Sequence, residues 1–163
     1  MPTKNIAVIG DRFVRTSQLL DTIRMVTRDS GYTLRFVTDE HDWPDSPMQR
    51  DSEINEYTGE YNRTIELLRE AEIAAIHMAG INKKVLDGAS QLQLIACARG
   101  GAVNVNLAAA TQRNIMVSNA PGRNSQAVSE YTVALIISIT RGLFFGYHEL
   151  TATSKWRTDL YRY

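Results

Sequence analysis

The residues of this chain that could bind a ligand are concentrated between positions 97 and 130. Gly100 and Gly101 form a glycine pair, which lets a ligand approach the backbone closely and presents N–H groups to it. Arg99, directly before the pair, could hold a carboxylate or a phosphate through two parallel hydrogen bonds. The competing interpretations are a plain tight turn for the glycines and an inert surface position for the arginine. The pattern indicates a site for a small anion, with both alternatives still open.

Two asparagines flank a Pro-Gly turn shortly after the glycine pair. A turn around Pro121 and Gly122 holds an amide side chain where it can bond either a ligand or the protein's own backbone. We expect Asn119 to stabilise the turn and Asn124 to contact a ligand.

No constellation of catalytic side chains is visible in the sequence. His41, His77 and His148 are far apart in the chain, and none has metal-ligand spacing to a cysteine or a carboxylate. We interpret His77 as a histidine whose hydrogen bonds are satisfied at the end of a buried strand, and Cys97 as a buried structural thiol. Neither glycine-rich nucleotide fingerprint occurs. We therefore expect no catalytic residue, no metal and no bound cofactor in this chain alone.

The composition argues against several classes of function. The 163 residues suffice for one domain with a real core, and Lys+Arg and Asp+Glu are balanced at 18 each. No basic run with interleaved aromatic residues occurs, which argues against a nucleic-acid partner. No apolar run reaches the roughly 18 residues of a membrane span. A single cysteine fits a reducing compartment, and the start of the chain does not resemble a signal peptide, so we expect a cytoplasmic protein.

The elements that must position these residues alternate between strands and helices. Compact apolar or β-branched runs predict strands at 5–10, 33–37, 72–77, 91–97 and 115–118. Helical periodicity predicts helices at 16–29, 60–71, 83–89 and 107–113. This alternation predicts an α/β fold with a doubly wound parallel sheet of about five strands. Ligands of such sheets bind beyond the carboxyl ends of the strands.

One long segment, 38–57, breaks the alternation. It is polar, contains Trp43, Pro44 and Pro47, and has no clean periodicity, so we predict a long loop with at most one helical turn. Loops of this length are often lids or partner-binding arms, although an exposed insertion without a role is the commoner outcome. Trp43 could anchor a partner or cover the edge of the sheet.

The segment 125–146 predicts one long helix that is apolar on more than one face. One stripe of this helix contains Val128, Leu135, Ile139 and Leu143. A single sheet cannot cover a helix of this kind, so a second domain or a second subunit must cover it. Ser125 is expected to cap the start of the helix, and the polar stretch 147–163 is expected to be a linker.

A set of fixed positions runs without a gap through the second half of the chain. The set comprises Leu92, Leu94, Ile95, Gly101, Asn104, Leu107, Ala108, Ala109, Ala110, Ile115, Val117, Asn119, Pro121, Asn124, Val128, Glu130, Leu135 and Arg141. In these positions the chain resembles the D-isomer-specific 2-hydroxyacid dehydrogenases, the family that includes D-3-phosphoglycerate dehydrogenase.

The chain also departs from that family pattern. Arg99 stands where the family usually has its first glycine, and Val103 and Asn106 replace its two aspartates. Cys97 stands where some members carry an arginine. The loop 77–80 lacks the Arg-Ser of phosphoglycerate-specific members, so the resemblance leaves the exact 2-hydroxy acid open, and Arg99 could replace a lost anion contact.

The resemblance implies a division of the chain. Residues 1–120 would form a flavodoxin-like substrate-binding domain, 121–147 a crossover helix that also makes dimer contacts, and 148–163 a linker toward an NAD-binding domain. The family's catalytic arginine, glutamate and histidine would lie further downstream, so NAD is expected in the intact enzyme and not on this chain alone. Substrate contacts are implied for Met78, Ala79, Arg99, Gly100, Gly101 and Asn124. Dimer contacts are implied for Val128, Leu135 and Ile139.

Three functions are therefore compatible with the sequence. The leading one is the substrate-binding part of an NAD-dependent oxidoreductase acting on the CH–OH group of a 2-hydroxy acid, homodimeric and inactive alone. D-3-phosphoglycerate, a substrate of serine biosynthesis, is its first candidate. The second is a truncated module that regulates a full-length homologue by sharing its dimer helix. The third is a phospho-receiver-like domain, which Asp11 suggests but which the sequence His77-Met78, with no aspartate, disfavours.

Overall fold

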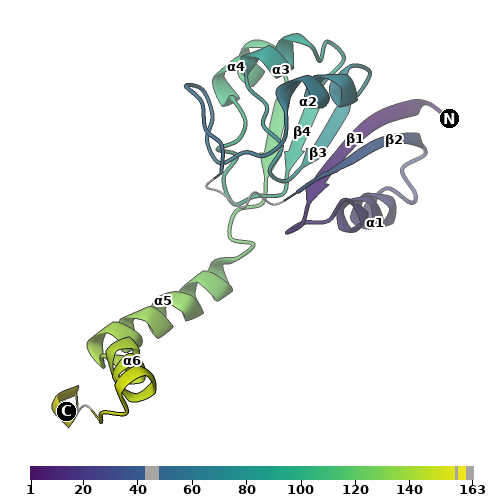
Figure 1. The fold of residues 1–163 in the computed structure, drawn as a ribbon. Helices are drawn as coiled ribbons and strands as arrows, with labels where there is room; N and C mark the ends of the chain where they lie inside the picture. Colours follow the sequence, from purple (N-terminus) through teal and green to yellow (C-terminus); the bar gives the residue numbers. More distant parts are fainter. Residues whose placement is uncertain (43–47, 157, 161–163) are drawn as a thin grey trace. The chain divides into compact units, whose positions relative to one another are not determined.

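The computed structural model describes residues 1–42, 48–156 and 158–160, and the chain divides into two compact units, Met1–Pro121 and Gly122–Tyr163. The first unit contains a five-stranded parallel sheet in the order β2-β1-β3-β4-β5 (Figure 1). Its strands are β1 (Thr3–Asp11), β2 (Thr33–His41), β3 (Ile73–Ile76), β4 (Leu94–Cys97) and β5 (Met116–Asn119). This sheet confirms the predicted α/β fold.

Helices cover both faces of the sheet, as the doubly wound prediction requires (Figure 1). The helices are α1 (Thr16–Val26), α2 (Tyr61–Leu68), α3 (Lys83–Asp87) and α4 (Leu107–Gln112). Ala7 and Ile9 of β1 belong to the core under α2, α3 and α4, whereas Ile6 and Val8 face α1. Because successive strand residues point to opposite faces, a strand that is covered on both sides must be apolar without a break.

The segment 38–57, predicted as a loop, is partly strand. β2 continues to His41 because its pairing with β1 runs on to Asp11. The prediction that the strand ends at Val37 is therefore wrong. Trp43, Pro44 and Pro47 lie outside the described residues. Further along, Gln49 and Tyr57 exchange backbone hydrogen bonds in both directions, each 3.1 Å long.

Two carboxylates tie the segment 48–57 to the starts of three helices. Asp51 accepts hydrogen bonds from the Tyr61 hydroxyl, at 2.5 Å, and from Asn82 Nδ2, at 3.1 Å. Glu53 accepts one from Asn106 Nδ2, at 2.7 Å. Tyr61 begins α2, and Asn82 and Asn106 cap α3 and α4. α3 follows β3 and α4 follows β4, so both helices start beyond the carboxyl ends of strands. The segment 48–57, which is bonded to these helix starts, therefore lies along the carboxyl edge of the sheet.

The second unit contains two helices where the sequence predicted one. α5 (Ser125–Thr140) and α6 (Leu143–Thr153) are bent by 63° relative to each other, and a short 3₁₀ helix, Thr158–Leu160, follows. Gly142 has a φ of 63°, which a glycine adopts without steric cost, and it separates the two helices. The prediction of one helix over 125–146 is therefore wrong, and the stretch 147–163, expected to be a linker, begins with the end of α6.

The start of α5 also differs from the prediction. Asn124, not Ser125, is the cap residue, and its side chain makes no capping hydrogen bond. Ser125 is already helical, and its backbone N–H bonds the Gly122 carbonyl at 3.0 Å.

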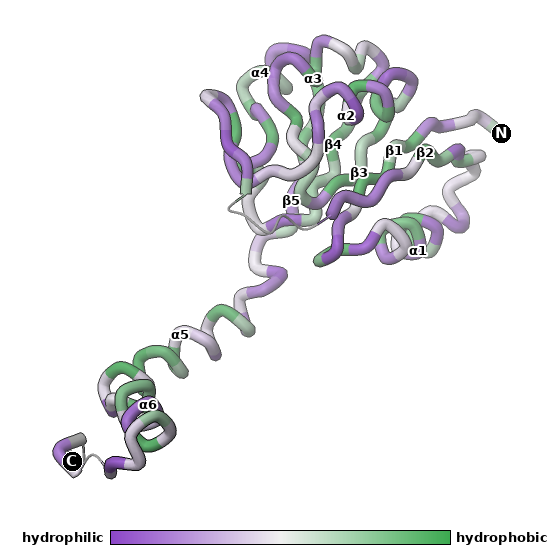
Figure 2. Tube along the Cα trace, in the orientation of Figure 1, coloured by the Kyte–Doolittle hydropathy of each residue, from purple (hydrophilic) through white to green (hydrophobic). Residues whose placement is uncertain are grey.

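Both helices of the second unit carry exposed apolar side chains, and Figure 2 shows hydrophobic residues recurring along them. The most exposed are Ile139 (73%), Phe145 (71%) and Tyr147 (71%). Among the described residues, no single helix is long and apolar enough to cross a membrane. α5 and α6 reach that length and apolarity only when the two bent helices are taken together.

Candidate functional site at the carboxyl edge of the sheet

The strand order places the switch point of the sheet at β1. β1 lies between β2 and β3, so the connections after β1 and β3 leave the sheet in opposite directions. A doubly wound sheet binds its ligands at the carboxyl end of such a switch point. The residues at this edge are therefore the ones to inspect for chemistry.

A buried pair fills the edge between β1 and β3. His77 Nδ1 lies 2.6 Å from Asp11 Oδ2, and both side chains are almost completely buried. Asp11 Oδ1 also accepts the backbone N–H groups of Phe13 and Val14, at 2.8 and 2.9 Å. The Phe13 ring stacks on His77, with the ring centroids 5.9 Å apart. The prediction that His77 is a satisfied histidine at a strand end is confirmed.

The environment of Asp11 keeps it ionised. Burial by itself would raise the pKa of Asp11, but the His77 hydrogen bond and the Val14 and Phe13 N–H bonds outweigh it and hold that pKa below its ordinary value. A carboxylate can only accept hydrogen bonds, so His77 carries its proton on Nδ1.

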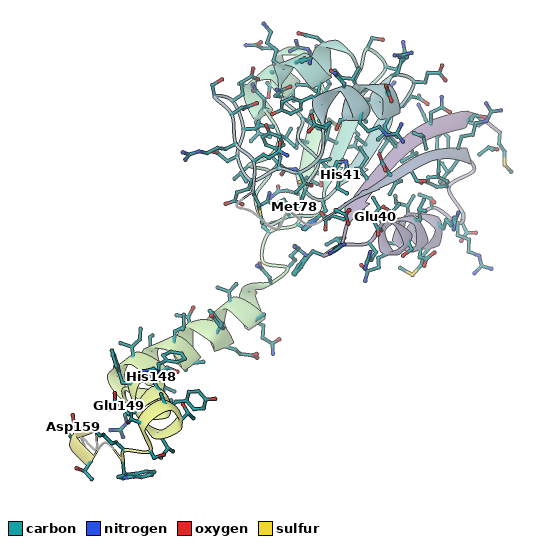
Figure 3. The ribbon with its side chains drawn as sticks, viewed as in Figure 1. Glu40, His41, Met78, His148, Glu149 and Asp159 are labelled. Carbon is teal, nitrogen blue, oxygen red and sulfur yellow. The ribbon has the colours of Figure 1, made fainter. Side chains whose placement is uncertain are left out.

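A second histidine lies at the same edge, one strand away. His41, labelled in Figure 3, ends β2 opposite Asp11. Its Nδ1 lies 3.2 Å from the Thr58 hydroxyl, and its Nε2 has no hydrogen-bond partner among the described residues. Burial lowers the pKa of His41. A Cβ on Gly59 would lie 2.2 Å from the His41 ring, so only glycine fits there.

The sheet therefore brings together two histidines that are far apart in the chain. His41 and His77 lie on strands that flank β1, whereas His148 belongs to α6 in the second unit. The sequence contained the residues but no signal of their proximity, because pairing of parallel strands is a tertiary property.

The glycine pair after β4 is open. A Cβ on Gly100 or Gly101 would meet no described atom within 4 Å, and neither residue has a φ in the left-handed region. Neither backbone conformation nor packing among the described residues therefore requires glycine at these positions. Close approach of a ligand to the backbone therefore explains why glycine stands at both positions.

Arg99 is engaged within the chain. Its guanidinium donates to the Glu56 carbonyl at 2.8 Å and forms an ion pair with the Glu56 carboxylate. Glu56 has a positive φ of 52°, uncommon for a residue that is not glycine. The arginine therefore binds a carboxylate as its chemistry suggests, and the carboxylate is one from the protein.

Asn104 joins the two loops that are expected to hold the substrate. Its side chain is fully buried, and Nδ2 donates to the His77 and Ala79 carbonyls at 3.0 and 2.8 Å. The Cys97 thiol lies 3.6 Å from Asn104 Oδ1. Asn104 has no role in the sequence beyond its place in the family pattern. It is a polar residue between Val103 and Val105, after a buried strand, and this was the only signal in the sequence that its side chain could be buried and hydrogen-bonded.

The other residues that the sequence singled out differ in their placement. Met78 and Ala79 have buried side chains, so only their backbone could meet a ligand. Asn119 Nδ2 donates to the Gly100 carbonyl at 2.7 Å, so this bond holds the loop after β4 and not the turn around Pro121 and Gly122. Asn124 belongs to the second unit. Cys97 is buried, which confirms the prediction of a structural thiol.

The described residues fit neither a metal nor a dinucleotide. They contain no group of three His, Cys, Asp or Glu side chains that could hold a metal ion. In a dinucleotide fold, the turn after the first strand holds the pyrophosphate on backbone N–H groups. Here the N–H groups of Phe13 and Val14 already bond the Asp11 carboxylate. The space beside Gly10 is also filled by the protein, since a Cβ on Gly10 would lie 2.3 Å from the Thr16 backbone nitrogen.

The model of the catalytic domain of D-isomer specific 2-hydroxyacid dehydrogenases matches residues 36–160. The chain belongs to this family. The match extends well beyond the stretch 92–141 on which the resemblance rested, since it also takes in most of β2 and all of α2 and α6.

Individual relatives and solved structures are also similar to this chain. The D-3-phosphoglycerate dehydrogenase of Archaeoglobus fulgidus is 35% identical over 80 residues, which are 47% of this chain and 15% of that protein. Among solved structures, an acyclic imino acid reductase (Bsp5) in complex with NADPH and D-Arg has a TM-score of 0.68 at 19% identity. The likeness covers 96% of this chain and 44% of that one. The NAD⁺-bound 3-phosphoglycerate dehydrogenase of Entamoeba histolytica has a TM-score of 0.59 at 18% identity, over 96% and 43%.

These structures share the fold of the 2-hydroxyacid dehydrogenase domain. The chain spans less than half of the length of the relatives and structures it matches.

Proposed function

We propose that this chain is the substrate-binding part of an NAD-dependent oxidoreductase that acts on the CH–OH group of a 2-hydroxy acid. The observation that carries the proposal is the open glycine pair Gly100-Gly101 at the carboxyl end of β4, in a chain of the 2-hydroxyacid dehydrogenase family. D-3-phosphoglycerate is the first candidate substrate, because one of the relatives is a D-3-phosphoglycerate dehydrogenase.

The binding chemistry follows from the edge of the sheet. The substrate carboxylate accepts hydrogen bonds from the N–H groups of Gly100 and Gly101, where no Cβ obstructs its approach. Asn104 holds the neighbouring loop at His77 and Ala79, so that both loops keep their spacing when the substrate enters. Arg99, directly before the pair, is held in place by the Glu56 carboxylate.

Hydride transfer itself uses groups outside this chain. When bound, NAD takes the hydride from the carbon that bears the hydroxyl. We assign the cofactor and the catalytic arginine, glutamate and histidine to a further domain, so that this chain alone binds substrate without turning it over.

We also assign to α5 a contact between two copies of this chain. Val128 and Ile139 expose 53% and 73% of their surfaces, and Leu135 between them is partly covered. A homodimer through this stripe would remove apolar side chains from water. A regulatory module that shares α5 with a full-length homologue would use the same surface, and it is the second candidate function.

Binding of D-3-phosphoglycerate to the full chain, followed through the backbone amide signals of Gly100 and Gly101, tests the main proposal. Gly101→Pro removes one N–H donor and should weaken binding by about tenfold or more, since a hydrogen bond to a charged group contributes about 1.5–3 kcal/mol. Gly101→Ala keeps the N–H, its Cβ meets no described atom within 4 Å, and it should bind within about twofold of the parent.

D-glycerate serves as the matched ligand without a phosphate. Similar binding of both acids would show that the carboxylate is what the site recognises. Equal losses in the proline and alanine variants, or amide signals of the pair that do not move in either titration, would overturn the proposal.

A further inference from the structure

β2 is a long edge strand with one free side. It pairs with β1 over all nine residues, from Thr33 to His41, and among the described residues no strand lies beyond it in the sheet. The opposite edge strand, β5, has only four residues. A regular edge of this length presents unpaired backbone groups that can pair with another strand.

The hydrogen bonds of β2 show which residues face outward. The Thr33 N–H donates to the Pro2 carbonyl of the neighbouring strand at 3.0 Å. The Asp39 carbonyl accepts the Thr16 hydroxyl, which in turn accepts the Gly10 N–H of β1. In a parallel ladder both backbone groups of a residue point to the same neighbour and successive residues alternate. The backbone N–H and C=O groups of residues 33, 35, 37 and 39 therefore bond β1. The backbone groups of Leu34, Phe36 and Thr38 point away from β1, to the free side of the strand.

The outward residues permit antiparallel pairing of β2 with a second copy of itself. Hydrogen-bonded pairs must then join outward residues, so the two-fold axis can pass through Val37 or through Phe36. An axis at Val37 places Phe36 opposite Thr38, and these two exchange their outward N–H and C=O groups. It also places Arg35 opposite Asp39 at both ends, in the closely spaced pairs without backbone hydrogen bonds.

Charge complementarity selects the axis at Val37. Arg35 is exposed and forms no ion pair in the part of the chain that the structure describes. Asp39 keeps part of its carboxylate exposed beside Arg63, to which it is bonded at 2.8 Å. The axis at Phe36 would instead oppose Arg35 to Val37 and leave Asp39 opposite Thr33. Opposite charges across a strand pair stabilise it by about 0.2–1 kcal/mol.

The face of β2 that carries Arg35 and Val37 is also left uncovered by its own helix. A groove of about 340 Å³ separates this part of β2 from the end of α2, and Arg35, Val37 and Leu67 are among the residues that line it. Val37 exposes 42% of its surface. Space therefore remains beside the strand for the side chains of a second copy.

We propose that β2 pairs with β2 of a second copy of this chain, antiparallel and centred on Val37, so that one sheet runs through both copies. The contact is separate from the α5 surface and does not depend on the proposed enzymatic function. A chain with both contacts would associate beyond a dimer.

A cysteine placed on the axis tests the register in the full chain. Two copies of Val37→Cys would face each other in a closely spaced pair, within the Cα distance of about 7 Å that a disulfide tolerates. Arg35→Cys is the matched control, because two copies of residue 35 would be offset by four positions, or about 13 Å. Phe36→Cys reports the alternative axis. Cys97 is buried and remains in all three variants.

Under mild oxidation, Val37→Cys should form a disulfide-linked dimer at least about tenfold faster than either control. A fastest reaction at position 36 would overturn the register. Equal rates at all three positions would overturn the pairing and leave the edge free for another extended chain.

A charge reversal provides a test without oxidation. Arg35→Glu places like charges opposite Asp39 at both ends and should reduce the dimer measured by sedimentation. Arg28→Glu makes the same charge change at an exposed position outside β2 and outside the groove, and should leave the dimer unchanged. Both variants are measured with Ile139→Glu present, which removes the contribution of α5. Equal effects of the two reversals would contradict the proposed pairing.

Discussion

At the scale of single residues, Asp11 is a buried carboxylate on which three hydrogen bonds converge. It receives hydrogen bonds from His77, Phe13 and Val14, and its own side chain is completely buried. A buried carboxylate is stable only when its bonds are satisfied, and here burial is outweighed by three donors. We therefore assign the Asp11-His77 pair the role of joining the ends of β1 and β3, next to the loop that is proposed to hold the substrate.

Replacing Asp11 by alanine should lower the free energy of unfolding by about 3–5 kcal/mol, because His77 and two backbone N–H groups lose their acceptor in a buried site. Urea denaturation followed by circular dichroism measures this. Asp21→Ala, on the exposed side of α1, is the control and should change stability by less than about 0.5 kcal/mol. A loss below about 1 kcal/mol for Asp11→Ala would contradict the assigned role.

At the scale of elements, the segment 48–57 depends on acceptor carboxylates. Burial alone would raise the pKa of Asp51, but hydrogen bonds from Tyr61, from the backbone of Glu53 and Ile54, and from Asn82 lower it to about 2. The same contact with Asp51, together with burial, raises the pKa of the Tyr61 hydroxyl. Asp51 thus holds the segment against the starts of α2 and α3.

The lowered pKa of Asp51 gives this attachment a defined pH dependence. Its contribution to stability is fully present above the ordinary pKa of 3.8 and is lost as the pH falls toward about 2. The stability difference between the parent and Asp51→Asn should therefore shrink over this interval. Denaturation at several pH values measures it, with Asp29→Asn, an exposed site, as the control. A stability difference between the parent and Asp51→Asn that stays constant down to pH 2 would contradict this explanation.

At the scale of the whole molecule, the apolar surface of α5 is where we propose that two copies of the chain associate. None of the residues of α5 or α6 is buried, although both helices are rich in large apolar side chains. Exposed apolar surface of this extent marks interaction sites in soluble proteins. The proposed homodimer through Val128, Leu135 and Ile139 covers the stripe that the sequence pattern singled out.

Ile139→Glu should weaken association through α5 by about tenfold or more, because it buries an unpaired charge in an apolar contact. Gln126→Glu adds the same charge to α5 away from the stripe and should have little effect. Analytical ultracentrifugation over a concentration series measures both. A parent chain that stays monomeric at micromolar concentration, or equal effects of the two substitutions, would rule out the α5 contact.

The sequence by itself determined the order of strands and helices, the parallel sheet and the family. These follow from local patterns, since buried parallel strands are apolar without a break and the gaps between them fit short crossover helices. The sequence also contained the signal that ends α5, because Gly142 follows Arg141 as a glycine follows a helix end. The strong apolar pattern on both sides of Gly142 hid that signal.

Only the tertiary structure decided which distant residues share the edge of the sheet. The Asp11-His77 pair, the Asn104 bonds to the loop after β3, and the ion pair between Arg99 and Glu56 all join residues that strand order brings together. Hydrogen bonds of this kind depend on three-dimensional proximity and leave no periodicity in the chain. For the same reason, the free side of β2 and its self-complementary charges became visible only when the neighbour of each strand was known.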